Sequence, residues 1–120
     1  MCLEKITKIY KKPDPKERVG WKLVSYISID KTHFDSSCVN KTYKTNRWLK
    51  SSGSWSFDYP IGFHIFEKKK DAKEIIKNSV VFQNDELVKV KYRKTVARGI
   101  ESMGGQKSNC IVAKEMKVIV

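Results

Sequence analysis

The sequence predicts an α+β fold, with residues 1–120 forming a single compact domain of mostly antiparallel β-sheet and one or two short helices. Apolar and polar residues alternate with period two in several segments, whereas apolar residues recur at helical spacing in only one short stretch. The chain has 120 residues, of which 40% are hydrophobic and 11% aromatic. A chain of this size and composition can form one core without support from a metal or disulfide.

The clearest pattern lies between Pro60 and Ile100, where a strand, a short helix and a second strand follow one another. Residues 61–66 form an apolar strand that ends at the charged run 67–70. Asp71 stands where a helix N-cap is expected, and Asn78 suits the end of the helix because asparagine tolerates a left-handed backbone. Ala72, Ile75 and Ile76 share one face of this helix, so that face can pack on a sheet.

The second strand of this unit runs from residue 87 to residue 94. Its apolar face is formed by Val88, Val90 and Tyr92. The residues between them are all basic, namely Lys89, Lys91 and Arg93. This alternation predicts a strand with one apolar face and one basic face, which suits an anionic ligand.

The remaining segments add further strands. Leu3, Ile6 and Tyr10 have near-helical spacing, but residues 3–10 are short and β-branched, which favours a strand. A proline-containing break at 11–16 separates them from a strand at 21–29, and a turn at 30–32 leads into a partner strand at His33. Residues 55–59 predict a short strand and 104–109 a loop. Residues 110–120 alternate with apolar groups on both faces, which indicates a central strand. The apolar end at 118–120 also suggests an exposed edge, and hence a homo-oligomer.

Residues 35–58 form a polar stretch with scattered aromatic and basic side chains, and two interpretations stay open. In the first interpretation, Trp48 and Trp55 lie in a loop with Arg47 and several lysines. The aromatic rings of this loop stack on a base, and its cations contact phosphates. Alternatively, both tryptophans pack beneath a long loop as part of the core.

The charge balance predicts an anionic partner. Lys plus Arg number 25 and Asp plus Glu 13, which gives a formal charge of +12. A generically basic, solvated surface is the alternative. Arg18, Arg47, Arg93 and Arg98 are the more informative cations, because a guanidinium binds phosphate as a planar fork.

We expect neither an enzyme nor a metal or other cofactor. The three cysteines, Cys2, Cys38 and Cys110, lie far apart and lack ligand spacing with the histidines, which suits a reducing cytoplasm. His64 lies within an apolar strand and is expected to be a hydrogen-bonded core residue. The sequence does not open with a long apolar segment, so we expect neither a signal peptide nor a membrane span.

Several short segments together resemble a class of phage-encoded proteins. They are Met1–Leu3, Gly20–Lys22, Tyr59–Phe66, the helix at Asp71 and Ile111–Met116. On these segments the chain resembles the first described type of phage Thoeris anti-defence protein. That resemblance implies an α+β sponge in the host bacterial cytoplasm. Such a sponge binds cyclic ADP-ribose signalling isomers between subunits without cleaving them. The resemblance also implies a homo-oligomer (dimer or hexamer) and, in some members, a separate site for cyclic oligonucleotides.

The candidate ligand-binding residues follow from chemistry and not from the resemblance. A cyclic ADP-ribose isomer carries a pyrophosphate, riboses and an adenine, which require cations, an aromatic ring and amide or carboxylate groups. The candidates that supply these groups are Arg93, Arg98, Lys91, Phe82, Trp55, Asn109 and Glu115. A basic protein that binds nucleic acid or inhibits a nuclease is the less favoured alternative, because no nucleic-acid-binding motif is visible.

Overall fold

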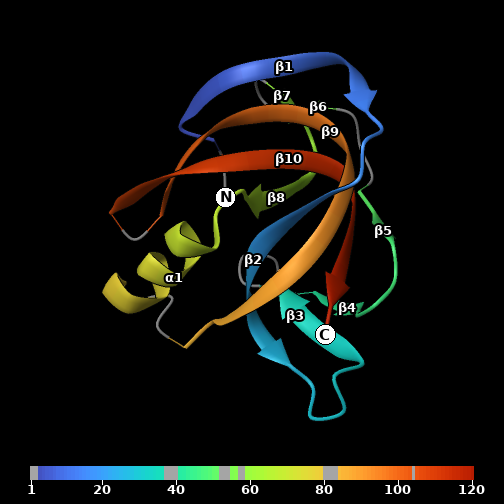
Figure 1. The fold of residues 1–120 in the computed structure, drawn as a ribbon, viewed down its shortest axis with the longest axis vertical. Helices are drawn as coiled ribbons and strands as arrows, with labels where there is room; N and C mark the ends of the chain where they lie inside the picture. The colour runs from blue at the N-terminus through green and yellow to red at the C-terminus, as the bar shows by residue number, and fades with distance from the viewer. Residues whose placement is uncertain (1–2, 37–40, 52–54, 57–58, 80–83, 104) are drawn as a thin grey trace.

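The computed structural model describes residues 3–36, 41–51, 55–56, 59–79, 84–103 and 105–120. At residues 55, 56, 60 and 103 the description covers the backbone alone. The chain forms a compact domain of antiparallel β-sheet with one short helix (Figure 1). In the part of the chain that is described, no helix is long and apolar enough to cross a membrane.

Ten strands and one helix follow one another along the described part of the chain. They are β1 (Lys5–Asp14), β2 (Arg18–Ile27), β3 (His33–Ser36), β4 (Thr42–Lys44), β5 (Leu49–Lys50), β6 (Trp55–Ser56), β7 (Tyr59–Pro60), β8 (Phe63–Phe66), α1 (Lys69–Asn78), β9 (Glu86–Met103) and β10 (Gln106–Ile119). Eight strands form one sheet in the order β1-β9-β10-β8-β2-β3-β4, with β5 also paired to β10. Strands β6 and β7 pair separately.

The sheet closes on itself because β2 pairs with both β8 and β9. Strands β9, β10, β8 and β2 therefore form a ring, and the largest buried cluster packs between them. This main core includes Val24, Phe34, Ile65, Val88, Val90, Tyr92, Ile111, Ala113, Met116 and Val118. The predicted apolar face of residues 88–92 is thus confirmed.

Strands β9 and β10 form the longest pairing of the fold, from Lys89 opposite Ile119 to Met103 opposite Gln106. Their register shifts once, where Ala97 faces Val112 but Thr95 faces Ala113, so that Val96 has no directly opposed partner. This irregularity has the character of a β-bulge. Just before it, Lys94 has a left-handed backbone with φ of 59°.

Strand β9 is longer than the sequence predicts, since it continues through Arg98 and Gly99 where we expected the chain to approach a loop. The reason is the edge strand β1, which packs closely against β9. A Cβ atom at Gly99 would lie against the carbonyl oxygen of Lys5, so the glycine permits strand pairing here. The predicted break at residues 11–16 is also wrong at its start, because β1 continues through Pro13 to Asp14. An edge strand tolerates proline, and β1 lies at the edge of the sheet.

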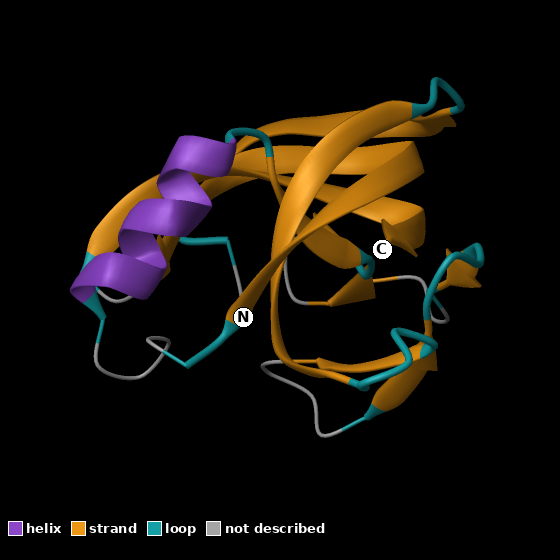
Figure 2. Cartoon of the chain, turned by 60° about the horizontal axis from the view of Figure 1, so that its bottom comes forward, coloured by secondary structure: helices purple, strands orange, loops and turns teal. Residues whose placement is uncertain are grey.

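The helix α1 packs across one end of the sheet, as Figure 2 shows. Ala72 and Ile75 are buried with Leu23 and Phe66, so the predicted apolar face is confirmed. The predicted N-cap at Asp71 is wrong, because the helix begins at Lys69 after the N-cap residue Lys68, whose side chain makes no cap hydrogen bond. The helix ends at Asn78, as predicted, but the residue that follows, Ser79, is extended and the chain does not leave the helix through a left-handed backbone.

The C-terminal strand is central, as predicted, but it is not an exposed edge. Strand β10 has β9 on one side and β8 and β5 on the other. Val118 is buried and only Val120 of the last three residues is exposed. The apolar end of the chain therefore gives no reason to expect an oligomer.

The contribution of the helix to stability can be measured with two neighbouring isoleucines. Ile75 is 1% exposed, and Ile76 is only partly buried. We predict that Ile75→Ala lowers the free energy of unfolding by about 2–4 kcal/mol, and that Ile76→Ala has a clearly smaller effect. Urea unfolding measures both values. Equal losses for the two variants would contradict this packing.

Candidate functional site

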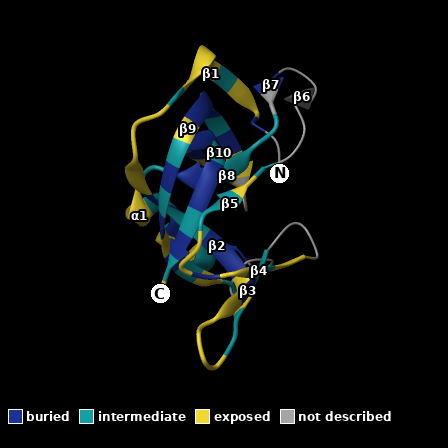
Figure 3. Cartoon of the chain, turned by 90° about the vertical axis from the view of Figure 1, so that its right-hand side faces the viewer, coloured by how far each residue is buried: buried dark blue, intermediate teal, exposed yellow. Residues whose placement is uncertain are grey.

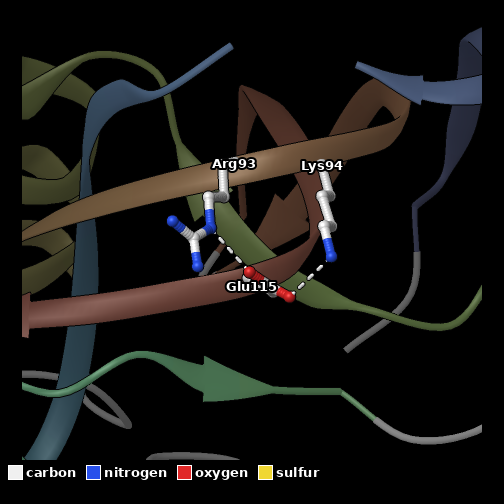
Figure 4. A network of polar contacts seen from close by, with 3 residues as sticks. All are labelled: Arg93, Lys94 and Glu115. Atoms are coloured by element: carbon white, nitrogen blue, oxygen red, sulfur yellow. Dashed lines mark hydrogen bonds and ion pairs between the residues drawn. The ribbon is translucent and has the colours of Figure 1, made fainter. Parts of the chain in front are cut away.

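A buried carboxylate on β10 holds two cations from β9 (Figure 4). Arg93 Nε donates to Glu115 Oε1 at 2.6 Å, and Lys94 Nζ donates to Glu115 Oε2 at 2.9 Å. Glu115 is 4% exposed, whereas the side chains of Arg93 and Lys94 are 37% and 49% exposed. The hydrogen bonds from Lys94 and Arg93 lower the pKa of Glu115. The carboxylate is therefore ionised at neutral pH and fixes the two cations at the surface.

The backbone explains how two consecutive residues reach one carboxylate. Arg93 lies directly opposite Glu115 in the β9–β10 pairing, so their side chains share a face. Successive side chains of a regular strand point to opposite faces. The left-handed conformation of Lys94 interrupts this alternation, and its ammonium group contacts the same Glu115.

Trp48 completes the site from a distant part of the sequence. The Arg93 guanidinium carbon lies 3.9 Å from the centroid of the Trp48 ring, and Lys117 Nζ lies 5.1 Å from it. Trp48 precedes β5, whose Leu49 and Lys50 pair with Met116 and Glu115. We call the surface formed by Trp48, Lys91, Arg93, Lys94 and Lys117 the Trp48 face.

Of the predicted site residues, the structure brings Lys91, Arg93 and Glu115 together on this surface, with Lys91 opposite Lys117. The Glu115 oxygens that we expected to accept a ribose hydroxyl already bind Arg93 and Lys94. Neither open interpretation of Trp48 is settled, but its ring is half-buried and in contact with cations. No local pattern in the sequence identifies this partner of Arg93.

The other predicted residues lie elsewhere or outside the described residues. Arg98 lies opposite Ile111 of the main core, and thus on the other face of β9 from Arg93, with its Nη2 3.6 Å from Glu67 Oε1. Asn109 is exposed on β10, six residues or roughly 20 Å from Glu115. Phe82 lies outside the described residues, and Trp55 is described only as backbone in β6.

A second set of polar groups, the buried Tyr59 and the half-buried His64, lies on the opposite side of β8 from the main core. Tyr59 Oη accepts from the Leu3 backbone at 2.9 Å and lies 3.2 Å from His64 Nε2. Burial, with a contribution from the charge of Lys22, lowers the pKa of His64 to about 4. His64 is therefore neutral at pH 7, with its Nε2 in hydrogen-bond contact with the Tyr59 hydroxyl, as expected for a structural histidine.

The described cysteine, Cys110, is also buried. Its Sγ donates to Glu101 Oε2 at 3.1 Å, and burial raises the pKa of both groups. A protonated, inaccessible thiol is a poor nucleophile. Among the described residues, no three His, Cys, Asp or Glu side chains are grouped closely enough to hold a metal ion.

Comparison with known protein families, with curated proteins and with solved structures finds no match for this chain.

The half-buried His64 predicts how stability depends on pH. The folded pKa of about 4 lies below the ordinary value of 6.5, so the unfolded chain binds more protons between these values. The stabilisation that comes from the lowered pKa of His64 is complete above pH 6.5 and is lost as the pH falls towards 4. We predict a loss of about 2 kcal/mol between pH 7.5 and pH 5.

Urea unfolding of wild type and His64→Gln at the two pH values measures this loss. His64→Gln should not show this loss of unfolding free energy between pH 7.5 and pH 5. His33→Gln, which changes an exposed histidine, should still show it. An unchanged pH dependence in His64→Gln would show that His64 titrates normally.

Proposed function

We propose that the protein binds a phosphate-bearing nucleotide on the Trp48 face and holds it without chemical change. The observation that carries this proposal is the fixed orientation of Arg93. Its Nε is held by Glu115 at 2.6 Å and its guanidinium lies over Trp48 at 3.9 Å. Figure 4 shows its terminal nitrogen atoms on the side away from Lys94.

A guanidinium held in this way is a preorganised phosphate fork. A free arginine loses rotational freedom when it binds, whereas Arg93 has lost part of that freedom on folding. Lys91, Lys94 and Lys117 add positive charge to the same surface, while Glu115 beneath it is buried. The net field therefore attracts an anion, and the arginine gives the contact its direction.

The indole of Trp48 suits the aromatic part of the same ligand. A nucleobase or other flat heterocycle stacks on tryptophan, and such stacking does not depend on which base is present. Phosphate groups beside Arg93 and a base beside Trp48 together describe a nucleotide. The polar groups of this face are cations and the Glu115 carboxylate, which already binds Arg93 and Lys94. This set of groups supports binding of the nucleotide without cleavage.

The specific ligand we propose is a cyclic ADP-ribose isomer, with a cyclic oligonucleotide as a further candidate. This part of the proposal rests on the resemblance of the chain to phage Thoeris anti-defence proteins. The same resemblance implies that the protein acts in the host bacterial cytoplasm. There the protein would sequester an immune signalling nucleotide. A second copy of the chain over the Trp48 face would bury the ligand and slow its release, which sequestration requires.

A nucleic-acid-binding function is the second candidate, and the helix supplies the observation that favours it. Lys69, Lys70, Lys73 and Lys77 line one shallow depression along α1, together with Glu74. Such a lysine row suits a polyanion and predicts binding that weakens steeply with salt. The Trp48 face, with its oriented guanidinium, favours the nucleotide.

The proposal predicts the effect of two substitutions on the Trp48 face. Arg93→Ala should weaken binding of a cyclic ADP-ribose isomer roughly 10- to 150-fold, because a charge-assisted bidentate contact is lost. Arg93→Lys should recover only part of this loss, since lysine restores the charge but not the fork. Trp48→Ala should also weaken binding, by removing the stacking surface.

Calorimetric titration measures these affinities, with thermal melting to show that each variant is folded. Arg98→Ala is the matched control, because Arg98 lies on the other face of β9, and it should bind like wild type. Recovery of the intact ligand after heat denaturation tests for sequestration without cleavage. If folded Arg93→Ala and Trp48→Ala bind as tightly as wild type, the Trp48 face is not the site.

A further inference from the structure

We propose that a second basic hollow, independent of the Trp48 face, binds the diphosphate or triphosphate group of a small anion. It has a volume of about 660 Å³ and lies between the β2–β3 turn and the segment that follows β4. Its functional lining is formed by Lys31, His33, Lys44, Asn46 and Arg47. We call it the turn hollow. Figure 3 shows the β2–β3 turn as an exposed projection next to β3 and β4.

Backbone and side-chain hydrogen bonds fix the walls of the turn hollow. Thr45 donates from its backbone N to Thr32 O at 2.9 Å and from Oγ1 to Lys31 O at 2.6 Å. Asn46 N donates to Val118 O at 2.7 Å, which ties the wall to β10. The two turns are thus joined to each other and to the sheet. A ligand therefore meets a surface whose shape is already set.

Positively charged side chains outnumber negatively charged ones in the hollow. Lys31, Lys44 and Arg47 are all exposed, and none has an acidic partner among the described residues. Asp30 is the one acidic side chain in the lining, and its Oδ1 accepts from Ser28 Oγ at 2.8 Å and from Thr32 Oγ1 at 2.8 Å within its own turn. Val120 also lines the hollow, and its backbone exchanges two hydrogen bonds of 3.3 Å with the side chain of Asn46. By contrast, Arg93, Lys94 and Arg98 each have an acidic partner.

The backbone of the hollow is strained in a way that glycine would relieve. Lys31 has φ of 59° and Asn46 has φ of 55°, and these are two of the three described non-glycine residues with positive φ. A lysine is unfavourable in this conformation, whereas glycine adopts it freely. Strained residues cluster at ligand-binding sites, where the side chain is needed despite its conformational cost. The side chain of Lys31 is such a case.

The composition of the lining indicates the class of ligand. The volume lies in the range of small-molecule sites. The lining contains three cations but no Phe, Tyr or Trp, so recognition depends on charge and not on base stacking. Three cations around one hollow suit the several charges of a diphosphate or triphosphate better than those of a single phosphate.

The test is calorimetric titration with inorganic tripolyphosphate near physiological ionic strength, because this probe lacks a base for Trp48. Lys31→Gly should raise the melting temperature and yet weaken tripolyphosphate binding roughly 10-fold or more. Arg47→Ala should also weaken binding. Lys12→Ala, on the exposed strand β1, should bind the probe like wild type, because Lys12 belongs to neither site.

The outcomes separate this inference from the proposed function. Loss of binding in Arg93→Ala, but not in Lys31→Gly and Arg47→Ala, would overturn the turn hollow and assign the phosphate to the Trp48 face. Equal small losses in all variants, including Lys12→Ala on the exposed strand β1, would show only a basic surface. An unchanged affinity in a stabilised Lys31→Gly would likewise overturn the proposal.

Discussion

The pairing of β9 with β10 is the constraint on which the rest of the structure depends. Strand β9 also pairs with β1 and β2, and β10 also pairs with β8 and β5, so these two strands anchor four of the six other strands of the main sheet. The register between them places Arg93 opposite Glu115 and Lys91 opposite Lys117. A slip of one residue would move all four side chains and would expose the apolar side of both strands. Core packing therefore fixes the geometry of the Trp48 face as well.

Both proposed sites lie where regular strand geometry is interrupted. All three described non-glycine residues with positive φ belong to them: Lys94 contacts Glu115, while Lys31 and Asn46 line the turn hollow. The two sites use their cations differently. On the Trp48 face Glu115 holds the cations and fixes the direction of a guanidinium. In the turn hollow the cations have no such partner and would be neutralised by the ligand itself.

The sequence predicted those features that depend on neighbouring residues. Alternation at residues 88–92 and the helical face at Ala72 and Ile75 were recognisable because core packing imposes a short period. The extension of β9 past Gly99 was not predictable, since it depends on the close approach of Lys5 from a distant strand. The contact of Trp48 with Arg93 was not predictable either, because a two-residue strand, β5, brings them together across 45 positions. The start of the helix at Lys69 was missed because it has no side-chain N-cap.

The central claim, that Arg93 and Trp48 together form a nucleotide site, is tested most directly by NMR titration. The Arg93 Nε–H and the Trp48 indole N–H are followed while a cyclic ADP-ribose isomer is added. The Trp21 indole serves as the internal control, because it also lies beside a cation, with Lys69 Nζ 4.9 Å from its ring centroid, but near α1. The account predicts that both resonances of the Trp48 face shift and saturate together while the Trp21 resonance stays in place. Saturable binding that leaves Arg93 and Trp48 unperturbed would contradict it.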